Sequence, residues 1–160
     1  MGTDRDRGIR VPAKGDRYGR DRKVFGVMPF TVKVAAQDSD GQLLVIEQDN
    51  AYPGGPPRHV HHEQDEWFYA IRGNYLVEVG GELHRLAPGD AAFAPRGVPH
   101  GWALDGTDPG RLLIVFQPAG AMESFFDAAC QLPNMPSPVE PGPLFEAHGM
   151  SIVGPPLRTA

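Results

Sequence analysis

The feature that most constrains the fold is a series of short apolar runs that begins after Lys23. Each run holds four to seven residues, is rich in Val, Ile, Leu, Phe and Tyr, and is bounded by Gly, Pro, Asn or Asp. Such runs are typical of β-strands, and their short, regular spacing favours a sandwich or a barrel. The nine clearest runs cover residues 30–36, 43–48, 58–61, 67–71, 75–79, 82–86, 90–94, 101–104 and 111–116.

Two connections between these runs predict tight β-hairpins. Gly73-Asn74 separates the fourth run from the fifth, and Gly80-Gly81 separates the fifth from the sixth. Such residue pairs tolerate the positive φ angles that two-residue hairpin turns require. We therefore expect the fourth, fifth and sixth runs to pair as adjacent antiparallel strands.

One segment, 121–132, predicts a helix, because its apolar residues recur at three- and four-residue spacing. These residues are Met122, Phe125, Phe126 and Ala129, and we expect the helix to pack across the outside of the barrel. The next segment, 133–143, holds five prolines and predicts an extended loop. A short helical turn over 144–148 and a tail are expected after it.

The length of 160 residues and the 41% content of hydrophobic residues fit one compact domain. We expect a flexible charged arm over 1–23, a β-barrel over 24–120, and a helix with a Pro-rich tail over 121–160 that packs on the barrel. No run approaches the roughly 18 to 20 apolar residues of a membrane span, and no signal peptide is evident. The single Cys130 suits a reducing compartment. Together these features predict a cytoplasmic protein with no membrane partner.

Charge is unevenly distributed along the chain, whose net charge is −5. Residues 1–23 contain eight of the fifteen basic residues and four acidic ones. Because the basic residues alternate with Asp and Tyr18 is the only aromatic residue in the arm, the pattern favours a solvated arm that drapes over a neighbouring subunit. We expect no nucleic-acid partner.

Three histidines and a glutamate indicate a metal site. His59 and His61 are two residues apart, so in a strand both side chains share one face. Glu66 follows a four-residue turn at the start of the next strand, and His100 enters a later strand after a Pro/Gly turn. Imidazole nitrogens and carboxylate oxygens bind divalent transition metals, and such a set leaves one or two positions of a five- or six-coordinate ion open to substrate.

Two segments that carry these residues resemble the two conserved motifs of the cupin superfamily. The first reads His-x-His, four residues, Glu, six residues, Gly and ends at Gly73, and the second reads Gly, five residues, Pro-x-Gly, two residues, His and ends at His100. The sequence departs from the pattern at Pro53, where the family has a glycine, and at Leu104, where some members have an asparagine. Neither departure falls on a ligand position.

The resemblance implies an all-β fold, a cupin jelly-roll barrel of two antiparallel sheets with a short C-terminal helical appendage. It places His59, His61, Glu66 and His100 on the family's four metal-ligand positions and suggests a homodimer. The ion would be one divalent transition metal, and Fe, Mn, Ni, Co, Cu and Zn all remain open. The phrases Asp65-Glu66-Trp67-Phe68-Tyr69 and Pro95-Arg96-Gly97-Val98-Pro99-His100 further resemble single-domain bacterial cupins of the quercetin dioxygenase-like group.

From this resemblance and the metal site we expect an oxidoreductase of dioxygenase type that acts with O₂ on an aromatic or enolisable small molecule. Glu66 would serve as a metal ligand and as the catalytic base. Two alternatives remain open: a cyclase or isomerase that uses the metal only as a Lewis acid, and a non-catalytic cupin that binds a small molecule. Fold alone does not decide between them.

Strand alternation also predicts the walls of a substrate cavity below the metal. Residues that share a face with Glu66 or His100, together with two from an earlier strand, are expected to bind substrate; they are Phe68, Ala70, Trp102, Leu104, Leu44 and Ile46. His62 points away from the neighbouring histidines and is expected at the rim. Arg96 is expected to pair with a surface acid or to meet an anionic group of the ligand.

Overall fold

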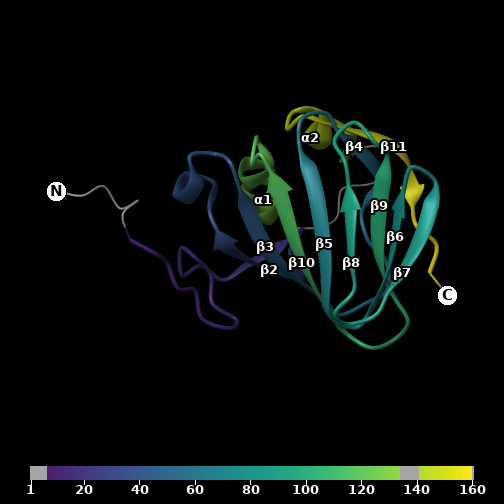
Figure 1. Cartoon of the computed structure of the whole chain (residues 1–160), viewed down its shortest axis with the longest axis horizontal. Coiled ribbons are helices and arrows are strands. Elements are labelled where there is room, and N and C mark those ends of the chain that lie inside the picture. Colours follow the sequence, from purple (N-terminus) through teal and green to yellow (C-terminus); the bar gives the residue numbers. More distant parts are fainter. Residues whose placement is uncertain (1–6, 134–140, 160) are drawn as a thin grey trace.

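The computed structural model of the chain describes residues 7–133 and 141–159 (Figure 1). Its strands are β1 Arg22–Val24, β2 Met28–Val34, β3 Leu44–Asn50, β4 Pro57–His61, β5 Asp65–Arg72, β6 Asn74–Val79, β7 Glu82–Leu86, β8 Ala91–Ala94, β9 His100–Asp105, β10 Gly110–Gln117 and β11 Met150–Pro156. The helices are the 3-10 helix η2 Ala36–Ser39 and the α-helices α1 Met122–Gln131 and α2 Pro141–Glu146. None of the helices in the described ranges is long and apolar enough to cross a bilayer.

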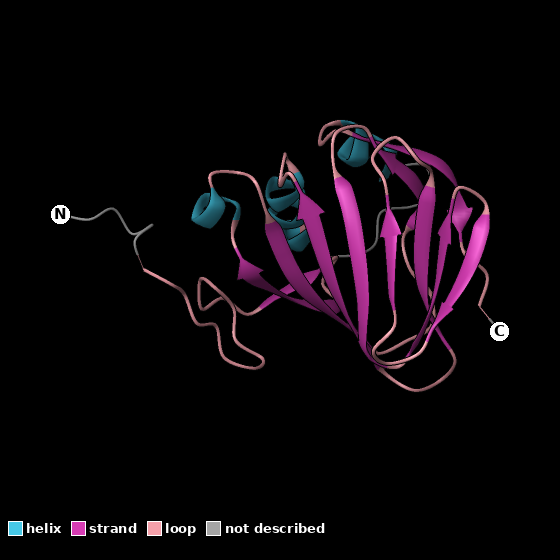
Figure 2. Ribbon diagram, in the orientation of Figure 1, coloured by secondary structure: helices cyan, strands magenta, loops and turns pink. Residues whose placement is uncertain are grey.

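The strands form two antiparallel sheets that face each other (Figure 2). One sheet has six strands in the order β1-β2-β3-β10-β5-β8, and the other has five in the order β11-β4-β9-β6-β7. The strands converge at the lower end in Figure 1 and diverge at the upper end, where α1 and α2 lie. This is the predicted all-β architecture, and every one of the nine predicted runs overlaps a strand.

Period-two alternation explains why these segments form strands. In β3 and in the first seven residues of β10, buried and partly exposed residues alternate at every position. One side chain of each pair therefore enters the space between the sheets while the next faces outward. The inward residues build one continuous core that α1 extends through its buried residues Met122, Phe125, Phe126 and Ala129.

The predicted hairpin at Gly80-Gly81 is confirmed, because β6 and β7 pair antiparallel with Val79 opposite Glu82. The hairpin predicted at Gly73-Asn74 is wrong, since β5 pairs with β10 and β8, whereas β6 pairs with β7 and β9. Gly73 instead carries the chain from one sheet to the other. Only glycine suits this position, for two reasons. The φ of Gly73 is +78°, and a Cβ at this position would lie only 2.8 Å from Gly110 Cα.

The C-terminal region contains more regular structure than the predicted tail. β11 pairs with β4 along the edge of the five-stranded sheet, with register shifts around Gly154. Its glycine and two prolines weaken the strand signal, which explains why the sequence did not reveal it. Of the predicted extended loop 133–143, residues 134–140 lie outside the described residues, and α2 begins before the predicted turn over 144–148.

Residues 16–23 of the predicted arm lie against the barrel. The carboxylate of Asp16 accepts a hydrogen bond from the Val32 amide at 2.8 Å, and the Tyr18 hydroxyl donates one to Glu123 at 2.6 Å. The first contact joins the segment to β2 and the second joins it to α1. Residues 22–24 then form β1, so the first sheet begins inside the predicted arm.

Candidate metal centre

The five-stranded sheet contributes three histidines to one point inside the barrel. On β4, His59 and His61 are buried while Val60 between them faces outward, as alternation requires. His100 begins β9, and its Cα is the register partner of His59. The ring centroids of His59 and His100 are 4.7 Å apart, and those of His61 and His100 are 5.3 Å apart.

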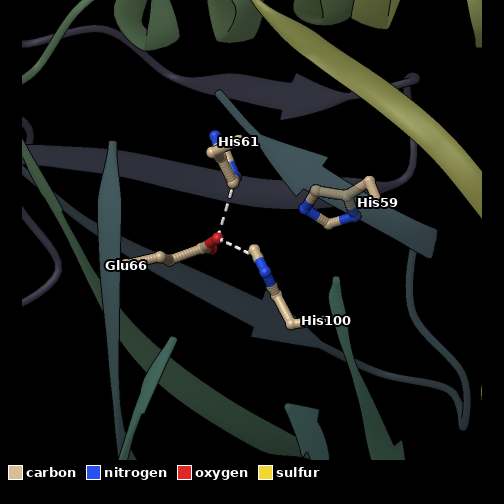
Figure 3. A group of neighbouring side chains, drawn as sticks. All are labelled: His59, His61, Glu66 and His100. Carbon is tan, nitrogen blue, oxygen red and sulfur yellow. Dashed lines mark hydrogen bonds and ion pairs between the residues drawn. The ribbon is translucent and has the colours of Figure 1, made fainter. Parts of the chain in front are cut away.

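Glu66 reaches the same point from the opposite sheet. It lies on β5, paired with Phe116 of β10 and Ala94 of β8. Figure 3 shows its carboxylate pointing between His61 and His100, with His59 facing the same space. The four residues are at most 4% exposed, and one potential ligand atom from each lies within 4.8 Å of all the others. The sequence prediction of these four as one group is therefore matched by their geometry.

Backbone carbonyls orient two of the imidazole rings. His59 Nδ1 lies 2.7 Å from the carbonyl oxygen of Pro57, and His100 Nδ1 lies 3.0 Å from that of Val98. A carbonyl only accepts hydrogen bonds, so each Nδ1 must carry the proton and donate it. In the neutral rings Nε2 is then the unprotonated nitrogen, which is the form that binds a metal.

The contacts around Glu66 require a positive charge. Its Oε2 lies 2.7 Å from His100 Nε2 and 2.9 Å from His61 Nε2. Among the described residues, neither nitrogen of His61 has a hydrogen-bond partner of acceptable geometry. Buried polar atoms without partners are rare in folded proteins. A cation among the carboxylate and the imidazole lone pairs would satisfy them, so the donor set fits a divalent transition metal.

The charges of the cluster shift its pKa values in different directions. Burial works to raise the pKa of Glu66, but the nearby His61 and His100 outweigh it and hold that pKa well below its usual value. Burial, reinforced by His100, lowers the pKa of His59 to about 3. For His100, burial is outweighed by the Glu66 carboxylate, so its pKa is raised. Near neutral pH, Glu66 is ionised and His59 is neutral, as metal ligands must be.

Neighbouring polar residues lie outside the cluster. His62 is exposed, and its Nε2 lies 2.8 Å from Ser151 Oγ, in agreement with a rim position. Arg96 pairs with Asp65, its Nη2 donating to Oδ2 at 3.2 Å. Both are therefore engaged at the surface.

A cavity of about 380 Å³ opens beside the four residues and reaches His59, His61 and Glu66. Most of its wall is apolar and comes from the segments around residues 24–28 and 51–57 and from β10, α1 and α2. The apolar side chains from the last three elements are Ile114, Phe116, Met122, Phe125, Phe126 and Phe145. This volume and lining are typical of small-molecule sites.

The predicted cavity wall needs correction. Of the six predicted substrate-binding residues, Trp102 lines the cavity, but Phe68, Ala70, Leu104, Leu44 and Ile46 do not. These five are 0% exposed because neighbouring core side chains cover them completely. They face the barrel interior as predicted, yet they serve its packing.

Most of the cavity wall was not predicted from the sequence, and three of its residues matter most for the site. Phe145 of α2 packs edge-on against the His59 ring at a centroid distance of 5.5 Å and covers that ligand. Gln48 and Asn50 of β3 are 4% exposed and also line the cavity. The sequence pattern could have indicated Gln48 and Asn50, because polar residues on an otherwise apolar inward face are unusual.

Comparisons with known proteins agree with this geometry. The sequence model of the Cupin domain family matches residues 51–116. The chain is 27% identical over 106 residues to quercetin 2,3-dioxygenase from Bacillus subtilis (strain 168), an alignment that covers 66% of this chain and 31% of that enzyme. The chain thus spans less than a third of this curated relative's length.

Solved structures share the fold. The TT1209 protein from Thermus thermophilus is 34% identical, with a TM-score of 0.51 over 57% of this chain and 83% of that one. An RmlC-like cupin from Shewanella frigidimarina is 22% identical, with a TM-score of 0.52 over 62% of this chain and 84% of that one. The second likeness bears on the fold alone.

Proposed function

This chain belongs to the cupin superfamily, and from its buried three-histidine, one-glutamate cluster we propose a metal-dependent enzyme of dioxygenase type that acts on an aromatic or enolisable small molecule. The observation that carries the proposal is the position of the cluster at the wall of a largely apolar cavity. An apolar cavity binds the aromatic part of a substrate, while the cluster faces the oxygen atoms of that substrate. The distant likeness to quercetin 2,3-dioxygenase supports the same chemistry.

His59, His61, Glu66 and His100 would hold the ion. When bound, a divalent transition metal would supply a Lewis-acidic centre that lowers the pKa of a substrate enol or hydroxyl. Both oxygen atoms of O₂ enter the product of a dioxygenase, so this reaction needs no external reductant.

Glu66 is the residue suited to move the substrate proton. Its carboxylate is ionised near neutral pH and reaches the cavity surface beside the histidines. A carboxylate in this position accepts the proton of an enol or phenol as the oxygen becomes negative. The carbonyls of Pro57 and Val98 keep two of the rings in place while this happens.

The apolar wall would exclude water from the reacting oxygen atoms. Phe145 covers His59, and Phe125 packs against Phe145 at a centroid distance of 5.1 Å. In a dry site, electrostatic effects on substrate oxygens are stronger than in water.

The test is O₂ uptake by the metal-loaded full chain with a flavonol, a catechol and a β-diketone. We expect uptake with at least one of them and a change in the metal's absorption spectrum on addition of substrate. Glu66→Gln should abolish uptake, while His62→Ala should retain it because His62 lies outside the cluster. Absence of both uptake and spectral change with all three would refute the proposal, and product formation under strict anaerobiosis would favour a cyclase or isomerase.

A further inference from the structure

The cavity has a second polar region, apart from the metal cluster, on β3. Gln48 and Asn50 face inward at the end of a strand whose other inward residues, Leu44 and Ile46, are apolar core. Two buried amide side chains on such a face are costly unless their polar atoms find partners. The protein itself provides hydrogen-bond partners for only some of these polar atoms.

Asn50 is held in one orientation. The Tyr75 hydroxyl donates a hydrogen bond to Asn50 Oδ1 at 2.9 Å, and burial raises the pKa of Tyr75, so this hydroxyl stays protonated. This bond orients the Asn50 amide so that its nitrogen remains as the donor. That nitrogen lies 3.8 Å from the sulfur of Met28.

Gln48 directs its amide nitrogen to the same sulfur, at 3.2 Å. A thioether is a weak acceptor, so two amide donors converge on a poor partner. The carbonyl oxygen Oε1 of Gln48 has no hydrogen-bond partner among the residues that the structure describes. Met28 also lines the cavity, and its side chain is long and flexible enough to move aside.

The strand register gives the separation from the metal cluster. On β10, Phe116 pairs with Glu66 and Leu112 pairs with Gln48, so the two levels differ by four residues along this strand. At roughly 3.4 Å per residue this is about 14 Å. Between the two levels lies apolar wall, including Ile114. A ligand that spans both polar regions therefore has an extended, aromatic or otherwise apolar body.

We propose that Gln48 and Asn50 form a recognition site for a hydroxyl group at the end of the substrate remote from its metal-binding oxygens. The hydroxyl oxygen displaces the Met28 sulfur and accepts from the two amide nitrogens, while its proton is donated to Gln48 Oε1. This inference rests on the proposed function, because it concerns the same cavity. It narrows the substrate to a bipolar molecule with oxygen donors at one end and a hydroxyl at the other.

The test compares two flavonols that differ by one group, the parent compound and the derivative with one extra hydroxyl in the para position of its pendant phenyl ring. Binding to the metal-loaded full chain is measured by calorimetry without O₂, so that neither probe is consumed. We expect the hydroxylated flavonol to bind about tenfold more tightly to the wild type.

Gln48→Met keeps the length of the side chain and removes both the donor and the acceptor of its amide group. We expect it to reduce the preference to less than about twofold while leaving the affinity for the parent flavonol within about threefold. Ile114→Val is the matched control, because it alters the cavity wall without a polar group and should preserve the preference. Metal content and thermal unfolding verify that each variant is folded and loaded.

Equal affinities of the two flavonols for the wild type, or a preference that survives in Gln48→Met, would overturn this inference and leave the proposed function standing. If neither flavonol binds to the metal-loaded wild type, this inference is overturned, while the proposed function is decided separately by O₂ uptake with the catechol and the β-diketone. If Gln48→Met does not fold, the affinities of the two flavonols for the wild type alone decide whether the inference holds.

Discussion

Glu66→Gln should remove most of the stabilisation that metal ions give to this protein. The substitution preserves the size of the side chain but replaces the one carboxylate among the four buried groups with a neutral amide. A free ion at about 100 times its Kd stabilises a one-site protein by about 2.7 kcal/mol. For a domain of this length, about 2 to 4 °C per kcal/mol converts this to a rise in Tm of about 5 to 11 °C.

The magnitude for the variant follows from the loss of a charged ligand. Loss of a residue that only supports a ligand already weakens metal affinity by about 10- to 100-fold, so loss of the Glu66 carboxylate should weaken it by at least about 100-fold. At the same metal concentration the ion then equals its Kd and stabilises by about 0.4 kcal/mol. The expected rise in Tm falls to about 1 to 2 °C.

The assay is thermal unfolding followed by circular dichroism, with each protein compared with its own metal-free form. This comparison removes any effect of the substitution on the metal-free fold. Glu63→Gln is the matched control, because it makes the same change of charge three residues away, at an exposed position outside the cluster. It should keep the full shift. A Glu66→Gln variant that also keeps the full shift would refute the assignment of Glu66 as a ligand.

Three further predictions concern the rest of the molecule. Asp16→Asn should cost about 1.5 to 3 kcal/mol of unfolding free energy at pH 7, because the carboxylate accepts three backbone hydrogen bonds and faces Arg22. Despite its burial, these contacts lower the pKa of Asp16, so its stabilisation is present above about pH 3.8 and is lost as the pH falls through the lower, folded-state pKa. Urea unfolding should show a smaller difference in unfolding free energy between the wild type and Asp16→Asn at pH 3 than at pH 7. An equal difference at the two pH values would contradict this prediction. Gly73→Ala should lower the unfolding free energy by more than about 1 to 2 kcal/mol, since a left-handed φ is combined with a contact to Gly110 backbone; an effect under about 0.5 kcal/mol in urea would count against the crossing turn. We also propose a homodimer through the outer face of β5 and β8, where Trp67 stands opposite the 54% exposed Phe93, so Phe93→Glu should halve the mass measured by light scattering.

His59 and His61 were predictable as a pair because the rule that places them is local, whereas Glu66 and His100 were assigned to the same site from the spacing of the two cupin-like motifs. Two histidines at alternate positions of one strand share a face in any sheet, and this needs no knowledge of the partner strands. The same holds for the Gly80-Gly81 hairpin, whose residues determine the turn by their own φ preferences.

The Gly73 turn shows where local rules end. A glycine between two strands is compatible with a hairpin and with a crossing between sheets, and the choice depends on which strands pair with β5 and β6. That pairing is a property of the whole jelly roll. Short segments such as β1 and irregular ones such as β11 depend on their neighbours in the same way.

By itself the sequence determined nine of the strands and their inward faces, since both follow from the two-residue period of a strand, and its cupin-like motif spacing identified the four clustered residues. Only the tertiary structure decided where the inward faces are covered by other side chains and where they border open space. Leu44, Ile46, Gln48 and Asn50 share one face of β3, yet the first two are core and the last two line the cavity. Packing of the two sheets and the helices around that strand makes the difference, because burial depends on residues distant in the sequence.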